Sequence, residues 1–255
     1  MGETGPVRAT TIAPSPLFVL LVTATVAGGA LAALTTGVAR TGGIVLLVLS
    51  GWAVSLCLHE FGHAIVAYRG GDRSVRAKGY LTLDIRRYTD PVLSLLLPLL
   101  LLAAGGIPLP GGAVWINHSA LRSRAIVSTV SLAGPLTNLA LGAVLIAVVG
   151  TGTLSDGLTA GLSYLALVQV LAFVLNILPV PGLDGFGVLE PYLSAPARRF
   201  AATVRPYAPL LLFVLIIGVP AVAWALFDAS FTVFDALGGN PAAAGAGLDE
   251  FLFWR

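Results

Sequence analysis

The stretch LCLHEFGHAIVAY, residues 56–68, places a glutamate between two histidines inside an otherwise apolar run. His59 and His63 are four positions apart, so on a helix both imidazoles lie on one face. Two imidazoles so placed can bind one Zn²⁺, and a glutamate beside the first histidine can act as general base toward water. Ionisable groups at membrane depth are costly, so their presence here indicates that they are used. We therefore interpret His59 and His63 as metal ligands and Glu60 as the catalytic base.

A catalytic zinc site needs a third protein ligand and one open position. Most of the 12 acidic residues lie in evident loops or tails, but Asp184 follows directly on an apolar run in LNILPVPGLDG. Pro179 and Pro181 end a helix there, and Gly182 and Gly185 allow the backbone to turn the carboxylate back toward the bundle. An ordinary Asp-Gly turn is the alternative interpretation. We take Asp184 as the candidate third ligand.

Composition defines the class of protein that must position these residues. Of the 255 residues, 57% are hydrophobic and only 10% are charged, and the mean hydropathy is +0.94, whereas a soluble domain has about 25% charged residues. This indicates an integral membrane protein, and we expect no nucleic-acid partner. Lys78 is the single lysine among 14 basic residues, which favours a GC-rich, bacterial source and therefore a bacterial cell membrane.

The apolar runs predict an all-α polytopic membrane protein with about five transmembrane helices. A crossing needs about 20 apolar residues. Five stretches qualify: Leu17–Val38, Ile44–Tyr68, Ala125–Val149, Leu158–Leu178 and Pro209–Phe227. Pro220 predicts a kink in the last. The first is longer than the apolar run of a signal peptide, so we expect it to be retained.

Basic residues indicate the orientation. They cluster in segments 69–90, 118–124 and 190–206, and the positive-inside rule places these segments in the cytoplasm. The apolar stretch Val92–Ala104 lies between two such segments and is too short to cross, so we expect a re-entrant hairpin. The sequence GYLTLDIRRY, residues 79–88, alternates apolar and polar residues and predicts a short β-strand pair at the cytoplasmic face.

Topology links the hairpin to the metal site. With the hairpin, the second and fourth spans both run from outside to inside, so Asp184 emerges on the side of the histidines. His63 precedes Arg69 by six residues, which places it roughly 9 Å below the interface. A full crossing by Val92–Ala104 would place Asp184 on the opposite face. The charge rule and the zinc geometry therefore require the same hairpin, with the active site toward the cytoplasm.

Three motifs in this order resemble the site-2 protease family of intramembrane zinc metalloproteases: HEFGH, then SLAGPLTNL, then NILPVPGLDG. The resemblance covers about residues 43–230 and is strongest to compact members without a PDZ or CBS domain. It implies one zinc per chain, held by His59, His63 and Asp184, with Glu60 as base. We expect one domain over residues 1–255 with its core at 43–230 and a C-terminal tail at 231–255.

The resemblance also implies that Asn176 and the pair Gly134 and Asn138 line or support the active site. Both asparagines are thus candidates to bind substrate or an oxyanion. From its position alone, Asn176 could equally form an interhelical hydrogen bond.

The expected function is cleavage of transmembrane segments of other membrane proteins by zinc-activated water. Single-span regulators of the anti-sigma type are the substrates that the resemblance implies, in contact with membrane lipid. The alternative is a metal-binding membrane protein or transporter without proteolytic activity. A transporter would need polar residues at several depths, and outside the metal cluster the spans offer little beyond Asn138, Gln169 and hydroxyls.

Overall fold

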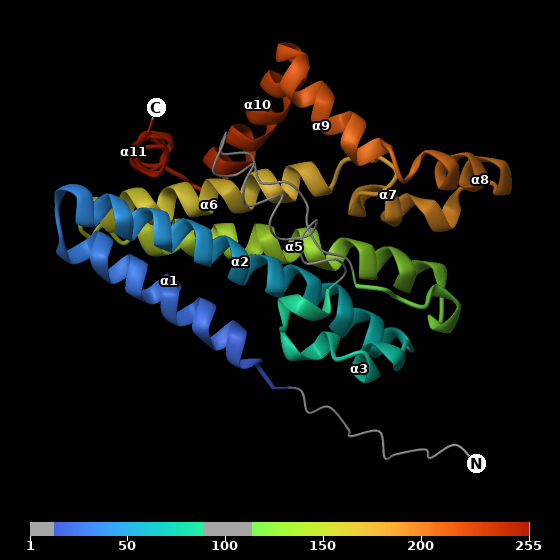
Figure 1. The fold of residues 1–255 in the computed structure, drawn as a ribbon. Helices are drawn as coiled ribbons and strands as arrows, with labels where there is room; N and C mark the ends of the chain where they lie inside the picture. The colour runs from blue at the N-terminus through green and yellow to red at the C-terminus, as the bar shows by residue number, and fades with distance from the viewer. Residues whose placement is uncertain (1–12, 89–113, 255) are drawn as a thin grey trace.

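The structure, a computed structural model, describes residues 13–88 and 114–254 (Figure 1). The expected hairpin over residues 92–104 lies outside these ranges. Four long helices form the bundle: α1 Pro16–Leu34, α2 Gly37–Gly70, α5 Arg124–Val149 and α6 Asp156–Asn176. Shorter helices are α3 Ser74–Ala77, α7 Asp184–Leu189, α8 Ala195–Val204, α9 Ala208–Gly218, α10 Pro220–Ala236 and α11 Pro241–Phe251. Single 3₁₀ turns are η1 Tyr80–Thr82, η2 Ile85–Arg87, η4 His118–Ala120 and η5 Glu190–Tyr192.

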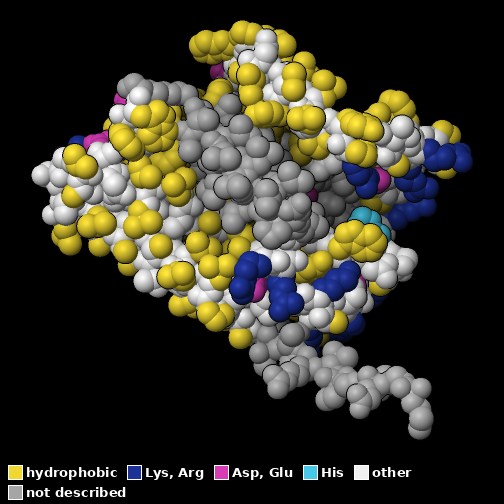
Figure 2. Space-filling model, viewed as in Figure 1, with side chains coloured by type: hydrophobic (Ala, Val, Ile, Leu, Met, Phe, Trp, Pro, Cys, Tyr) yellow, Lys and Arg dark blue, Asp and Glu magenta, His cyan; other side chains and the backbone are white. Residues whose placement is uncertain are grey.

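The four long helices are each long and apolar enough to cross a membrane, and they coincide with the first four predicted spans. At 34 residues, α2 is roughly 51 Å long, so it extends well beyond a hydrocarbon core of about 30 Å. Figure 2 shows hydrophobic side chains along the flanks of the molecule, with most Lys and Arg gathered toward the end where α3 and α8 lie. The prediction of a helical, multi-pass membrane protein is confirmed.

The fifth predicted span, Pro209–Phe227, is not one continuous helix. The helix α9 ends at Gly218, Val219 is extended with φ −123° and ψ 97°, and Pro220 begins α10. Proline disfavours the helical region for the residue before it, so the expected kink is a complete break, and α9 and α10 meet at an apex in Figure 1. A fifth crossing would instead combine α8 and α9, which are bent by 62° relative to each other.

The predicted β-strand pair is wrong. Residues 79–88 form the turns η1 and η2, and the described ranges of the chain contain no strand. Leu81 and Ile85, both buried, are four positions apart, a spacing that also suits consecutive turns packed on one side. Gly79 and Leu83 have positive φ values of 77° and 55°, and each bends the chain before an extended segment can form.

Glycines allow the long helices to pack closely. A Cβ added at Gly43 would lie 2.6 Å from the Ala32 nitrogen and 2.9 Å from the Gly28 oxygen, so α1 and α2 touch through their backbones. At the other end of the chain, a Cβ at Gly247 of α11 would lie 2.2 Å from the Ala160 oxygen of α6. These contacts fix α1 against α2 and α11 against α6.

Substitution of Gly43 tests the contact between α1 and α2. Gly43→Ala should destabilise the protein by about 1–3 kcal/mol, because the added methyl overpacks a backbone contact. Gly42 is a matched control, since a Cβ there meets nothing within 4 Å and alanine favours a helix. Thermal unfolding in detergent, followed by circular dichroism, measures both; equal midpoints for the two variants would contradict the packing argument.

Candidate metal centre

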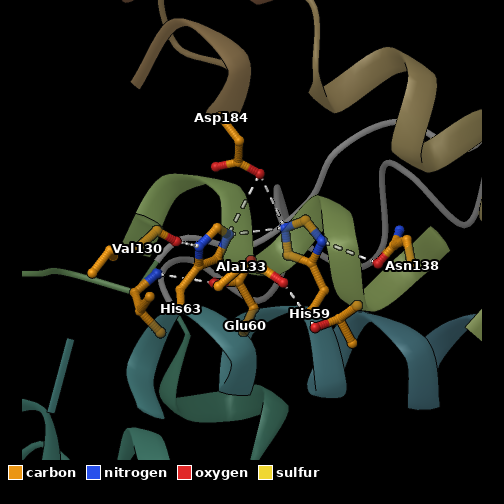
Figure 3. A network of polar contacts seen from close by, with 9 residues as sticks. His59, Glu60, His63, Val130, Ala133, Asn138 and Asp184 are labelled. Atoms are coloured by element: carbon orange, nitrogen blue, oxygen red, sulfur yellow. Dashed lines mark hydrogen bonds and ion pairs between the residues drawn. The ribbon is translucent and has the colours of Figure 1, made fainter. Parts of the chain in front are cut away.

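The two histidines and Asp184 converge on one point (Figure 3). His59 and His63 lie one turn apart on α2, with ring centroids 4.8 Å apart and Nε2 atoms 3.1 Å apart. Asp184 Oδ2 lies 3.3 Å from the His59 Nε2 and 3.4 Å from the His63 Nε2. Within the described part of the chain this is the one group of three or more metal-ligating side chains.

Asp184 reaches the histidines because the chain turns sharply after α6. Gly182 adopts a φ of +101°, a conformation that favours glycine. A Cβ at Gly185 would lie 2.0 Å from the Ile177 oxygen, so α7 folds tightly against the end of α6. Figure 3 shows the carboxylate at the start of α7 directed at both imidazoles, and the Asp-Gly pair is more than a surface turn.

Both imidazoles are oriented by α5. The His63 Nδ1–H donates to the Val130 carbonyl at 2.7 Å, and His59 Nδ1 pairs with Asn138 Oδ1 at 3.1 Å. With the proton on Nδ1 in each ring, both Nε2 lone pairs are available to a metal. Sequence reasoning singled out Asn138 but missed Val130, because a main-chain carbonyl leaves no signal in the residue type.

Gly134 makes room for the two rings. A Cβ at this position would lie 2.2 Å from the His63 Nε2 and 2.6 Å from the His59 Nε2. Any side chain would therefore occupy the space next to the donor atoms. The pair Gly134 and Asn138 thus supports the site from α5, one by its absent side chain and the other by its amide.

The donor set fits zinc. Tetrahedral zinc with bonds of about 2.0–2.1 Å places its ligand atoms about 3.3 Å apart, and the three donor atoms here lie 3.1, 3.3 and 3.4 Å from one another. Two imidazole nitrogens and one carboxylate oxygen form a catalytic type of ligand set, which leaves a fourth position open.

A cavity of about 210 Å³ contains the donor atoms and further polar groups. Glu60, 3% exposed, lies in it, and its Oε2 accepts a hydrogen bond from the Val114 N–H at 3.1 Å. Asn176, the last residue of α6, also lines it and is buried. His118 lies in the turn η4 at the same cavity, outside the metal-ligating group.

This arrangement defines a class: a bundle of membrane-crossing helices that carries a zinc-type H-E-x-x-H site with an aspartate as third donor. The chain is 44% identical over 261 residues to "Putative zinc metalloprotease Rip2" of Mycobacterium tuberculosis, covering 100% of this chain and 98% of that protein. A protein of the same name from Mycolicibacterium smegmatis is 43% identical over 250 residues, 95% of each chain. "Putative zinc metalloprotease YwhC" of Bacillus subtilis is 30% identical over 174 residues, 64% of this chain and 77% of that protein.

No family model and no solved structure matches the chain. The similarity to relatives over nearly the whole chain nevertheless establishes its family. The chain belongs to the site-2 protease family of zinc metalloproteases. Its cofactor is therefore zinc, in agreement with the donor set, and its relatives are bacterial.

Substitution of Asn138 tests the orientation of the ligands. Asn138→Ala should lower zinc affinity about 10- to 100-fold, because the His59 Nδ1–H loses its acceptor and the ring its fixed orientation. Competition with a chelator measures the affinity. Thr129→Ala is the control, since Thr129 is exposed on the same helix and bonds only the Ala125 carbonyl of its own helix. Equal affinities of the Asn138 variant and the wild type would remove Asn138 from the site.

Proposed function

We propose that the protein is an intramembrane zinc endopeptidase that cleaves transmembrane segments of single-span membrane proteins. The observation that carries this proposal is the buried Glu60, on the same turn of a membrane-crossing helix as His59 and His63 and in one cavity with Asp184. A carboxylate in this place has a chemical use only if water and substrate reach the cavity.

The side chains divide the work of peptide hydrolysis. Zinc, when bound, lowers the pKa of water to about 7 and polarises a carbonyl. Glu60 takes the proton from the attacking water and passes it to the leaving amine. Asn138 is engaged with His59, so we assign it to ligand orientation.

Asn176 is the candidate donor to the substrate carbonyl. It lines the cavity, and its side chain has no hydrogen bond to any described residue, which disfavours an interhelical bond as its purpose. An amide N–H placed there would stabilise the oxyanion that develops during hydrolysis.

The size of the cavity supports cleavage of an unwound segment. A helix with its side chains is about 10–12 Å across. The cavity volume of about 210 Å³ is smaller than the volume of one helical turn of that width. A transmembrane substrate therefore enters with its scissile region extended, which also frees the peptide bond from its helical hydrogen bonds. Single-span regulators of the anti-sigma type are the substrate class that we propose.

Transport of a metal is less well supported. A transport path would need further ligands along the bundle, and the described residues provide one metal-ligating group. The other buried polar side chains of α6, such as Ser163 and Gln169, are neutral and do not extend that group.

We also propose that the site faces the cytoplasm, because the arginine-rich segments lie at its end of the bundle. In a Cys57→Ser background, Ser119→Cys, in the exposed turn η4, should react with an impermeant thiol reagent only from the cytoplasmic side. Thr153→Cys, exposed in the turn between α5 and α6, should react only from outside. Reversed labelling of the pair would contradict the orientation.

Substitution of the base tests the activity. Glu60→Gln should retain zinc and lose at least about 100-fold in cleavage rate, because the amide cannot accept the proton. Asp184→Ala is the complementary variant and should lose zinc. Purified proteins in liposomes, with a panel of single-span proteins, give cleavage and metal content together. A Glu60→Gln protein that still cleaves its substrate would contradict the proposed mechanism.

A further inference from the structure

A short segment beside α2, residues 114–117, is held by its backbone at three points. The Val114 N–H donates to Glu60 Oε2 at 3.1 Å, and the Trp115 carbonyl accepts from Lys78 Nζ at 2.9 Å. The Asn117 N–H donates to Asp72 Oδ2 at 2.7 Å. Glu60 belongs to α2, and Asp72 and Lys78 lie in the chain that follows it. The segment is therefore bound at Glu60 and again beyond the C-terminal end of α2.

Hydrogen bonds hold the side chain and the backbone of Asp72 in one position. It is 1% exposed, and its other oxygen, Oδ1, accepts from the Ser74 N–H at 2.9 Å and from the Ser74 hydroxyl at 2.6 Å. Its own N–H donates to the Ala67 carbonyl at 3.0 Å, which ties it to the last turn of α2. Burial raises its pKa, but the hydrogen bonds from Ser74 and Asn117 outweigh burial and lower the pKa overall, so the carboxylate is ionised at neutral pH.

We propose that Asp72 is a positioning residue for Glu60, acting through residues 114–117, with Lys78 as a second clamp. Asp72 contacts no metal-ligating side chain and is absent from the lining of the cavity, so its influence passes through the backbone. This inference rests on the proposed role of Glu60 as base.

The register of the segment explains why it must be held. Val114 and Asn117 are three residues apart, about 10 Å in an extended chain. A slip by one residue would move the Val114 N–H away from Glu60 Oε2 and leave this buried carboxylate without that donor. Asp72 prevents that slip from the far end of the segment, and Lys78 from the middle.

The kinetic test compares Asp72 with Asp84, a second buried aspartate in the chain that follows α2. Asp72→Ala should lower kcat about 10- to 100-fold, with KM and zinc content unchanged. Asp84→Ala is the matched control: Asp84 is also buried, but its carboxylate pairs with Arg86 instead of bonding to residues 114–117. It should lower thermal stability without changing kcat. Equal kcat losses in both variants would overturn the proposal.

Lys78 gives an independent variant should Asp72→Ala fail to fold. Lys78→Met keeps the aliphatic stem and removes the donor to the Trp115 carbonyl, so kcat should fall several-fold. Lys78→Arg retains a donor and should restore it. A Lys78→Met protein with wild-type kcat would overturn the clamp at that position.

Amide hydrogen exchange separates this inference from the proposed function. In Asp72→Ala, exchange at Val114 should rise at least about tenfold, as it should in Glu60→Leu, while exchange in α5 stays unchanged. Unchanged exchange at Val114 in Asp72→Ala overturns the positioning role, whether or not the wild type cleaves. Raised exchange at Val114 in Asp72→Ala, together with a wild type that cleaves no substrate, would support the clamp and overturn the proposed function alone.

Discussion

The structure depends on one constraint: the ionisable groups of the metal centre lie at membrane depth, where an unpaired charge is costly, and need partners from the protein. His59, Glu60 and His63 are all buried on a membrane-crossing helix, so their polar atoms take partners from neighbouring segments of the chain. Two features of the fold follow from that constraint. The helix α5 offers a carbonyl and an amide to the outer nitrogens of the imidazoles, and the chain after α6 turns back to bring a carboxylate to the inner ones.

The metal centre also determines where the chain can hold no side chain. A helix that approaches two imidazoles closely enough to orient them leaves no room for a methyl group, and Gly134 meets that demand. Gly182 and Gly185 serve the opposite wall, where the backbone itself has to fold tightly. The apolar bundle thus carries a polar centre whose walls are shaped as much by glycine as by its ligands.

Much of this arrangement was predictable because the sequence patterns are local or depend only on the number of membrane crossings that precede a segment. The spacing of His59 and His63 follows from helical periodicity, and the four long helices follow from apolar run length. Asp184 emerged from the prolines and glycines around it and from the side on which the fourth span ends. The structure brings all three together, although no contact between them is visible in any short stretch of sequence.

The remaining features depend on tertiary contacts that residue types do not report. The alternation in residues 79–88 is real, but packing against α2 selects turns instead of strands. The break at Val219 is stronger than the kink that Pro220 alone suggested. The sequence around Asp72 indicates only an acidic residue in a loop, because its partner is the main-chain N–H of residue 117. Val114 and Val130 likewise act through backbone atoms, which every residue has.

The origin of the three donors has a thermodynamic consequence. They come from α2 and from the start of α7, two segments far apart in the chain, and a bound ion joins these segments as a cross-link. Binding and folding then share one free energy, since the unfolded chain does not hold the three donors together. Each tenfold rise in free zinc above the dissociation constant adds about 1.4 kcal/mol to the stability of the folded state. A bound zinc thus stabilises the whole fold through a link between α2 and the start of α7.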